Sequence, residues 1–295
     1  MRDWLGYAVY RTLSGAFGLL PAPVMRRVGS GIGRLSSYFL KERKRLIGRH
    51  LQRAIGEPPS QRLIRDSFAS YGRYWAEVFW IRPRRKASFV AGTEVIGMEH
   101  VLAAVAGGNG LIMGVVHSGN WEAAGSVAES VGLRTLAVAE GLKNERIVEW
   151  FKWCRESMGI EIVVARKGSA ATRNLLAKLK SGGMIALVSD RVTGPKGVPV
   201  RFFGEMTTIP AGPAALADKT GAALLPVGCF FNDGPGHTIV VSAPIEIPSN
   251  VKDKTERVAL IAQRLATAYE DLIRRRPQDW HIFMENWPSD AADRT

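Results

Sequence analysis

The sequence predicts an α/β fold: a mainly parallel central sheet flanked by helices, preceded by a helical and basic N-terminal section. From about residue 89 onward, short apolar runs typical of buried strands alternate with helical stretches, the order that places helices on both faces of a parallel sheet. Before that point, apolar residues recur at helical spacing. With 295 residues and 46% hydrophobic content, the chain is long enough for one large domain.

The N-terminal section, residues 1–88, is expected to contain four helices. The first ends at Pro21 and Pro23, because proline lacks the backbone donor that a helix interior needs. A second helix runs from about Val24 to Leu40, and a basic helix follows from Lys41 to Ile55. Ser60 follows two prolines and is the expected N-cap of a fourth helix, which carries a stripe of aromatic residues.

The α/β core, residues 89–295, is expected to hold seven strands, at 89–96, 110–116, 134–139, 161–164, 184–189, 223–230 and 237–243. Helices at 98–106, 120–131, 143–158, 169–180, 210–220 and 254–276 separate most of them. The chain shows no internal repeat and no low-complexity linker, so residues 1–295 are interpreted as a single domain.

The positive charge is concentrated in one fifth of the chain. The net charge is +13, and the segment from Arg26 to Lys86 holds 16 Lys and Arg against 4 Asp and Glu, a net of +12. Such a surface indicates an anionic partner, a membrane or a nucleic acid, or else a solvated helical face. The longest uncharged run here, Thr12 to Met25, holds two prolines and falls short of the roughly 20 residues that a membrane span needs. The segment is therefore typical of one that lies on a membrane surface.

The strongest functional signal is the hexapeptide His117-Ser-Gly-Asn-Trp-Glu122, directly after the apolar run Leu111–Val116. His117 should emerge at the carboxyl end of a strand, where open α/β sheets place their chemistry. Within one helix, residues five apart lie roughly 140° apart, so Glu122 can hold the ring only if His117 lies in the turn and Glu122 in the first helical turn. The spacing therefore predicts a base and its orienting carboxylate at a strand-to-helix junction.

Other chemistries fit the sequence less well. The chain has no H-E-x-x-H pair and no zinc spacing of Cys154 and Cys229, so we expect no metal site and two buried thiols in a reducing compartment. Without a G-x-S-x-G elbow, Ser118 is expected to cap a helix rather than act as a nucleophile. His50 and His100 are expected at the surface.

Four more charged residues are candidates for the site. Glu140 ends the strand at 134–139, Arg155 lies at the edge of the apolar stripe of its helix, and Asp190 and Arg191 follow the apolar run 184–188. Charged residues just beyond buried strands are where ligands meet a sheet. Each of them alone is equally consistent with a surface ion pair.

The hexapeptide resembles the H-x4-D/E motif of the glycerolipid and lipid A acyltransferase superfamily. The longer block His-Ser-Gly-Asn-Trp-Glu-Ala-Ala-Gly, residues 117–125, is similar to the actinobacterial phosphatidylinositol mannoside acyltransferases, relatives of the lipid A late acyltransferases. Glu122 stands where the mannoside enzymes usually carry Asp and the lipid A branch carries Glu. Further similar blocks occur in the same order along nearly the whole chain, at residues 67–75, 138–143, 154–159, 202–205, 210–213, 220–226 and 279–281.

The resemblance implies transfer of an acyl chain from a thioester, acyl-CoA or acyl carrier protein, to a sugar hydroxyl of a membrane glycolipid, with a mannose of a phosphatidylinositol mannoside as the first choice. Acylation of lipid A or of a glycerolipid is the alternative. His117 would be the general base and Glu122 its orienting carboxylate. Arg155 and Arg191 would serve the oxyanion or substrate phosphates, and Glu140 and Asp190 would bind sugar hydroxyls. The implied partners are an acyl donor, a glycolipid acceptor and the cytoplasmic face of an anionic membrane; no cofactor is required, and no nucleic acid partner is expected.

Overall fold

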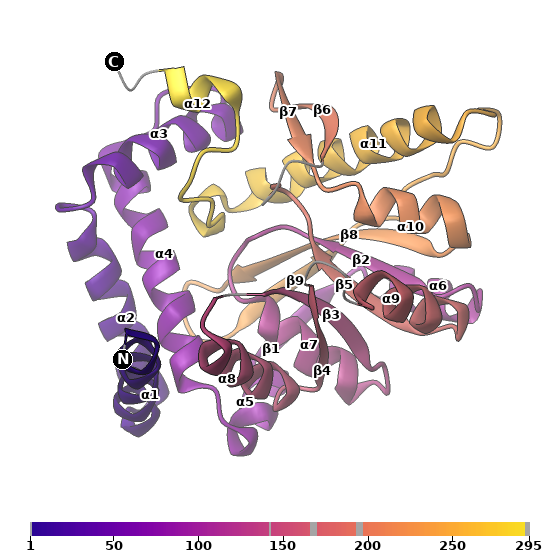
Figure 1. Ribbon diagram of the computed structural model, residues 1–295. Coiled ribbons are helices and arrows are strands. Elements are labelled where there is room, and N and C mark those ends of the chain that lie inside the picture. The colour runs from indigo at the N-terminus through magenta and orange to yellow at the C-terminus, as the bar shows by residue number, and fades with distance from the viewer. Residues whose placement is uncertain (1, 142, 166–169, 193–196, 293–295) are drawn as a thin grey trace.

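The computed structural model of the protein describes residues 2–141, 143–165, 170–192 and 197–292. A seven-stranded sheet with helices on both faces forms the centre of the molecule, and the N-terminal helices lie to one side of it (Figure 1). The predicted fold class, an α/β fold with a mostly parallel sheet and a helical N-terminal region, is confirmed.

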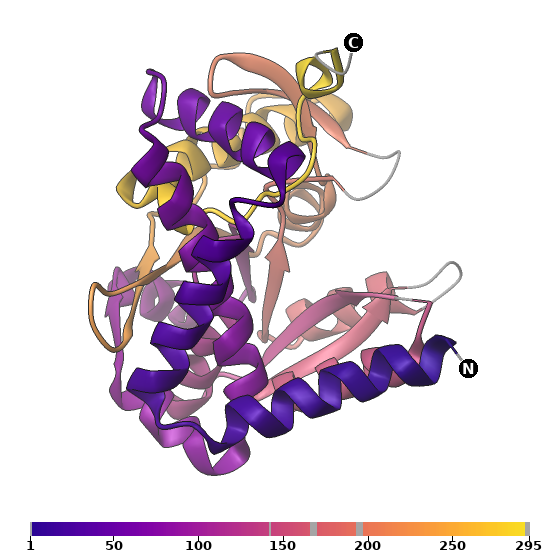
Figure 2. The same ribbon diagram turned by 90° about the vertical axis from the view of Figure 1, so that its left-hand side faces the viewer.

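The four expected N-terminal helices are present as α1 (Arg2–Leu19), α2 (Ala22–Ser36), α3 (Lys41–Ile55) and α4 (Gln61–Trp80). The hydroxyl of Ser60 accepts the backbone N–H of Leu63 at 3.1 Å, so Ser60 is the N-cap of α4 as predicted. Helix α2 packs along α4, and α1 packs against both α4 and α8 (Glu145–Glu156), with its N-terminal end pointing away from the other N-terminal helices (Figure 2). None of the helices within the described ranges is both long and apolar enough to cross a membrane.

The central sheet has the strand order β1-β9-β8-β2-β5-β3-β4. Neighbouring strands are parallel except for β8 and β9, which form an antiparallel pair. The strands are β1 (Thr93–Ile96), β2 (Leu111–Val115), β3 (Thr135–Glu140), β4 (Ile160–Ala165), β5 (Met184–Val188), β8 (Ala223–Phe231) and β9 (His237–Val241). Strands β2 and β5 are therefore neighbours although about 70 residues separate them in the chain, and this adjacency builds the site described below.

Two local expectations were wrong. The strand expected at 89–96 begins only at Thr93, because residues 86–91 form the short helix α5 (Lys86–Ala91) after the 3-10 turn η1 (Pro83–Arg85). Phe89 is buried in that helix and its ring lies 5.9 Å from that of Trp80, so packing against α4 decides the local structure. The antiparallel hairpin of β6 (Val198–Phe202) and β7 (Glu205–Ile209) was not predicted.

The two faces of the sheet bury alternate residues of the same strands. On β2, Leu111 and Val115 pack in the cluster with α6 (Met98–Ala106) and α7 (Trp121–Ser130). Ile112 and the following Val116 face the opposite side, where α9 (Ala171–Lys180), α10 (Gly212–Thr220) and α11 (Lys254–Arg275) lie. This alternation follows from the two-residue period of a strand, and it sets the side on which residue 117 emerges.

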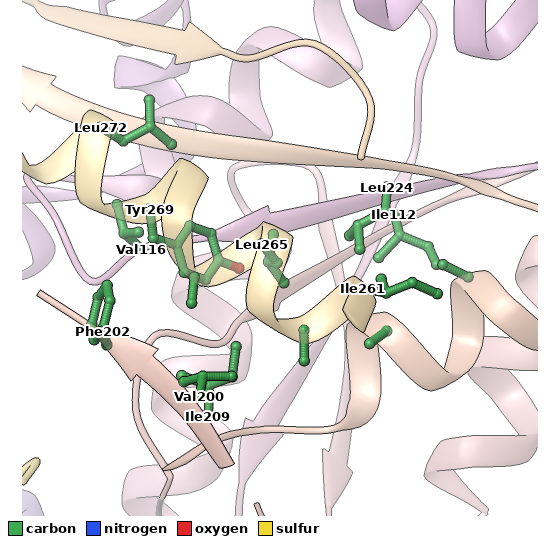
Figure 3. Packing of buried hydrophobic residues seen from close by; sticks show 14 of the residues in the cluster. Ile112, Val116, Val200, Phe202, Ile209, Leu224, Ile261, Leu265, Tyr269 and Leu272 are labelled. Carbon is green, nitrogen blue, oxygen red and sulfur yellow. The ribbon is translucent and has the colours of Figure 1, made fainter. Parts of the chain in front are cut away.

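Helix α11 supplies much of the core on the second face. Figure 3 shows Ile261, Leu265 and Tyr269 of this helix packed between the sheet residues Ile112 and Leu224 and the hairpin residues. The hairpin contributes Val200, Phe202 and Ile209, each at most 1% exposed. Burying a large apolar side chain stabilises a fold by about 1.5–3 kcal/mol, so the hairpin is an integral part of the core. The last two helical elements within the described residues are η2 (Pro277–Asp279) and α12 (Pro288–Ala292).

Candidate active site

His117 lies where the sequence places it, two residues beyond the end of β2, at the carboxyl edge of the sheet. Strands β2 and β5 are parallel, and Val115 is the register partner of Val188. Continuing this register by two residues brings His117 opposite Asp190. The Nδ1 atom of the His117 ring forms a short hydrogen bond with Oδ1 of Asp190.

Asp190 is fully buried and accepts further hydrogen bonds from two other donors. The backbone N–H of His117 donates to Oδ2 at 3.0 Å, and the indole N–H of Trp280 donates to the same oxygen at 2.8 Å. Burial disfavours the charged form, yet His117 and these N–H groups hold the pKa of Asp190 below its usual value. An ionised carboxylate only accepts hydrogen bonds, so Nδ1 of His117 carries a proton and Nε2 is left as the basic nitrogen.

Glu122 lies in the first turn of α7, as the spacing predicts, but it does not hold the His117 ring. Its carboxylate Oε1 pairs with Nε of Arg155 at 3.4 Å and lies 3.5 Å from the hydroxyl of Tyr74. Burial raises the pKa of Glu122, and the Arg155 guanidinium opposes this. Within the described residues, Oε2 is buried without a hydrogen-bond partner. The orienting carboxylate of His117 is therefore Asp190, and Glu122 instead orients Arg155.

The four residues predicted to bind substrate differ in where the structure places them. Asp190 is not placed to bind a sugar hydroxyl, because its two oxygens are occupied by His117 and Trp280 and the residue is 0% exposed. Arg155 and Arg191 both line the cavity that His117 lines. Glu140 ends β3 as expected, but its side chain lies outside the described part of the structure.

An apolar cavity of about 460 Å³ opens beside His117. It lies against the face of the sheet that α6 and α7 cover, and its size is in the ordinary range for ligand pockets, about 300–1,000 Å³. Strand residues line its floor and α7 residues line its roof, among them Met113, Val115, Ala137, Ile162, Ala186, Ala124, Val127 and Ala128. A cavity of this character fits an extended hydrocarbon chain whose polar end reaches His117.

The turn between His117 and Glu122 is held from two sides. Gly119 has a φ of 51°, and a Cβ atom there would lie 2.3 Å from the carbonyl oxygen of Cys229, so only glycine fits this approach. Asn120 caps α7 by accepting the N–H of Glu122 at 3.1 Å, and its amide donates to buried Glu77 at 2.7 Å. The expectation that Ser118 is the helix cap was wrong, because its hydroxyl accepts the N–H of Cys229.

Both cysteines are buried, as expected, and burial raises the pKa of each thiol to about 12. The expectation of a surface position was wrong for His50, which is 2% exposed and hydrogen-bonded to Asp290 at 3.0 Å. His100 is half-buried. Sequence reasoning missed the roles of Tyr74, Glu77 and Trp280. The block at residues 279–281 marked Trp280, but no pattern connected it to Asp190.

The chain is similar to known bacterial acyltransferases. The chain is 37% identical over 252 residues to the phosphatidylinositol mannoside acyltransferase of Mycolicibacterium smegmatis, covering 84% of this chain and 80% of that protein. It is 36% identical over 254 residues to the enzyme of that name from Mycobacterium tuberculosis H37Rv, covering 84% and 78%. The lipid A biosynthesis lauroyltransferase of Escherichia coli K12 is 27% identical over 251 residues, covering 82% and 78%.

A family model described as bacterial lipid A biosynthesis acyltransferase matches residues 1–289, nearly the whole chain. The matched range includes His117, Asp190 and the residues that line the cavity. The protein therefore belongs to the bacterial lipid A biosynthesis acyltransferase family.

Proposed function

We propose that this protein transfers a fatty acyl chain from a thioester donor, acyl-CoA or acyl carrier protein, to a hydroxyl of a mannose in a phosphatidylinositol mannoside. The observation that carries the proposal is the His117–Asp190 pair beside an apolar cavity of acyl-chain character. The acceptor class is taken from the names of the relatives that are 36–37% identical over 84% of the chain.

His117 acts as the general base in this reaction. Its Nε2 takes the proton of the sugar hydroxyl, while the hydroxyl oxygen attacks the thioester carbonyl carbon. Asp190 stabilises the imidazolium that forms, as the carboxylate of a serine triad does, except that here the substrate supplies the oxygen. The tetrahedral intermediate then collapses: the carbon–sulfur bond breaks, the ester remains, and the thiolate takes the proton from His117.

Arg155 is the proposed donor to the oxyanion of the tetrahedral intermediate. It lines the same cavity as His117, and its pairing with buried Glu122 fixes its guanidinium there. A donor that is already oriented stabilises developing charge without reorganising, which is the usual source of oxyanion stabilisation. Arg191, which also lines the cavity, is assigned to a phosphate of the donor or the acceptor.

The N-terminal helices are the proposed membrane-binding surface, on the cytoplasmic face of the cell membrane. Helix α1 exposes Leu5, Val9 and Leu13 at four-residue spacing, and α2 exposes Val24, Val28, Ile32 and Leu35 in a similar stripe. Exposed apolar surface of this extent marks an interaction site. Arg27 on α2 and Lys41 at the start of α3 are exposed basic residues of the same helical section, and each well-placed charge contributes about 1 kcal/mol to binding an anionic bilayer.

The test of the reaction is product analysis with competing acceptors. Wild-type protein receives an acyl-CoA together with mannosylated phosphatidylinositol and a lipid A precursor, and mass spectrometry identifies the acylated product. Acylated mannoside is the expected product; acylated lipid A precursor would assign the protein to the activity of the Escherichia coli relative instead. His117→Ala is expected to abolish both products, and His100→Ala, on α6, is the control that should leave them unchanged.

The test of the membrane surface is vesicle sedimentation. Binding to vesicles that contain phosphatidylglycerol should weaken with salt and with the double charge reversal Arg27→Glu and Lys41→Glu. The matched control is the double charge reversal Lys180→Glu and Lys219→Glu, at two exposed lysines on α9 and α10. Equal binding to neutral phosphatidylcholine vesicles at every salt concentration would contradict the electrostatic contribution.

A further inference from the structure

The segment Asp279–His281, which we call the C-terminal strap, lies across the turn that carries His117. Its backbone bonds the turn at two points: the N–H of Gly119 donates to the carbonyl of Asp279 at 2.9 Å, and the N–H of His281 donates to the carbonyl of His117 at 2.7 Å. Buried Asp279 anchors the strap by accepting the hydroxyl of Ser70 at 2.7 Å. The strap is thereby fixed relative to His117.

Between these two backbone bonds, the side chain of Trp280 reaches Asp190. The indole is 4% exposed, and its N–H donates to Oδ2 of Asp190 at 2.8 Å. The ring is held by aromatic neighbours: its centroid lies 5.7 Å from that of Phe203 and 6.1 Å from that of Trp287. The indole donor therefore has one orientation available to it.

The two carboxylate oxygens of Asp190 have different hydrogen-bond partners. Oδ2 accepts the indole of Trp280 and the backbone N–H of His117, whereas Oδ1 meets the His117 ring. Rotation of the carboxylate about its Cβ–Cγ bond would break the indole hydrogen bond. We infer that Trp280 is a positioning residue for the acyl transfer: it holds the carboxylate of Asp190 so that Oδ1 faces Nδ1 of His117, and it draws charge from that carboxylate.

This inference rests on the proposed function, in which His117 is the base, and it predicts a specific pH effect. Without the indole donor, Asp190 keeps more of its negative charge on the oxygen that meets the ring, and the protonated ring is stabilised. The base is then lost at a higher pH, so the acidic limb of the kcat profile moves upward in pH. The carboxylate is also free to rotate, and kcat falls by about 10- to 100-fold, as expected for one hydrogen bond to a charged group.

The other charged and titratable groups around the pair do not mimic this effect. Burial lowers the pKa of His281 on the strap to about 3, and burial raises the pKa of Tyr269 on α11 far above its usual value. Neither group changes its charge between pH 5 and 9. Arg155 on α8 and Arg191 beyond β5 line the cavity as permanent cations, and Glu122 on α7 is paired with Arg155.

The experiment compares Trp280→Phe with Trp80→Phe over pH 5 to 9, measuring kcat and KM in the purified protein. Trp80 is a matched control, because it is 8% exposed and donates its indole N–H to the carbonyl of Leu20 at 2.8 Å, not to Asp190. Its ring packs against Phe89. Both variants lose one buried indole donor, so both should lose thermal stability. Only Trp280→Phe should lower kcat and move the acidic limb, with KM little changed.

A profile for Trp280→Phe that coincides with wild type, or an equal shift in Trp80→Phe, would overturn the inference. The variant His117→Ala distinguishes this failure from failure of the proposed function. If His117→Ala is active, His117 is not the base and the proposed mechanism is refuted. If His117→Ala is inactive and the Trp280→Phe profile is unshifted, only the role of Trp280 is refuted. Should Trp280→Phe not fold, β-(3-benzothienyl)alanine at position 280 replaces the N–H by sulfur at nearly constant volume, and the same two outcomes apply.

Discussion

The substitution Asp190→Asn tests the assignment of the orienting carboxylate most directly. Asp190 accepts from three N–H groups, and an asparagine side chain has only one acceptor oxygen. If that oxygen stays with Trp280 and the backbone of His117, the amide NH2 faces Nδ1 of the ring. Nδ1 must then accept a hydrogen bond, the proton moves to Nε2, and the base is lost.

The expected loss in kcat is large. The corresponding change in a serine triad lowers kcat by about 10⁴-fold through the same tautomer reversal. At about 1.4 kcal/mol for each factor of ten, this equals roughly 5.5 kcal/mol of lost transition-state stabilisation. The assay is acyl transfer from acyl-CoA to mannosylated phosphatidylinositol, followed as product formed and thiol released, with thermal unfolding measured on the same preparations.

The chain offers a matched control in a second buried Asp–His pair. Asp290 is 0% exposed, contacts Nε2 of His50 at 3.0 Å and also accepts the backbone N–H groups of Asn286 and Trp287. Asp290→Asn should lower stability while the folded protein turns over normally, because this pair does not line the cavity. A kcat for Asp190→Asn within tenfold of wild type would refute the assignment of Asp190.

Three further outcomes follow from the same structure. Glu122→Gln should leave Arg155 less ordered and lower kcat by up to about 10²-fold, the size of effect seen when one oxyanion donor is removed. The acidic limb of the pH profile should stay in place, and a shifted limb would mean that Glu122 acts on the His117 ring. Ala128→Trp should fill the cavity and move kcat/KM toward shorter acyl-CoA chains, checked from octanoyl- to stearoyl-CoA, with exposed Leu102→Trp on α6 as the control that should not. The free energy of unfolding, measured by urea titration, should fall from pH 7 to pH 3. Burial lowers the pKa of His281 from 6.5 to about 3, so the folded protein binds this proton less readily than the unfolded chain. The resulting contribution to the free energy of unfolding is complete above pH 6.5 and is lost as the pH falls toward 3. A free energy that stays constant or rises as the pH falls, or a pH dependence that His281→Gln leaves unchanged, would contradict this.

Much of the fold is predictable because it depends on local patterns. Helices α2 to α4 and the strands β2, β5 and β8 lie close to their predicted ranges, since apolar periodicity and proline positions act within a few residues. The elements that were missed depend on distant partners: α5 forms where Phe89 packs on Trp80, and the β6–β7 hairpin is stabilised by contacts with α11. Position along the chain gives no sign of such partners.

The sequence by itself determined that His117 emerges at a strand end, that Glu122 starts the next helix, and that the chain resembles a family of acyltransferases. It identified Asp190 as a site residue but gave it a role in sugar binding. Only the tertiary structure decided which carboxylate meets the ring, because that choice depends on β5 lying beside β2, with residues 117 and 190 brought together by strand register. Tertiary contacts also decided two other roles: Glu122 pairs with Arg155, and Trp280, 90 residues from Asp190 in the chain, donates to the carboxylate that holds the base. Local spacing specifies where a side chain leaves a strand, but the order of strands in the sheet determines which side chain it meets.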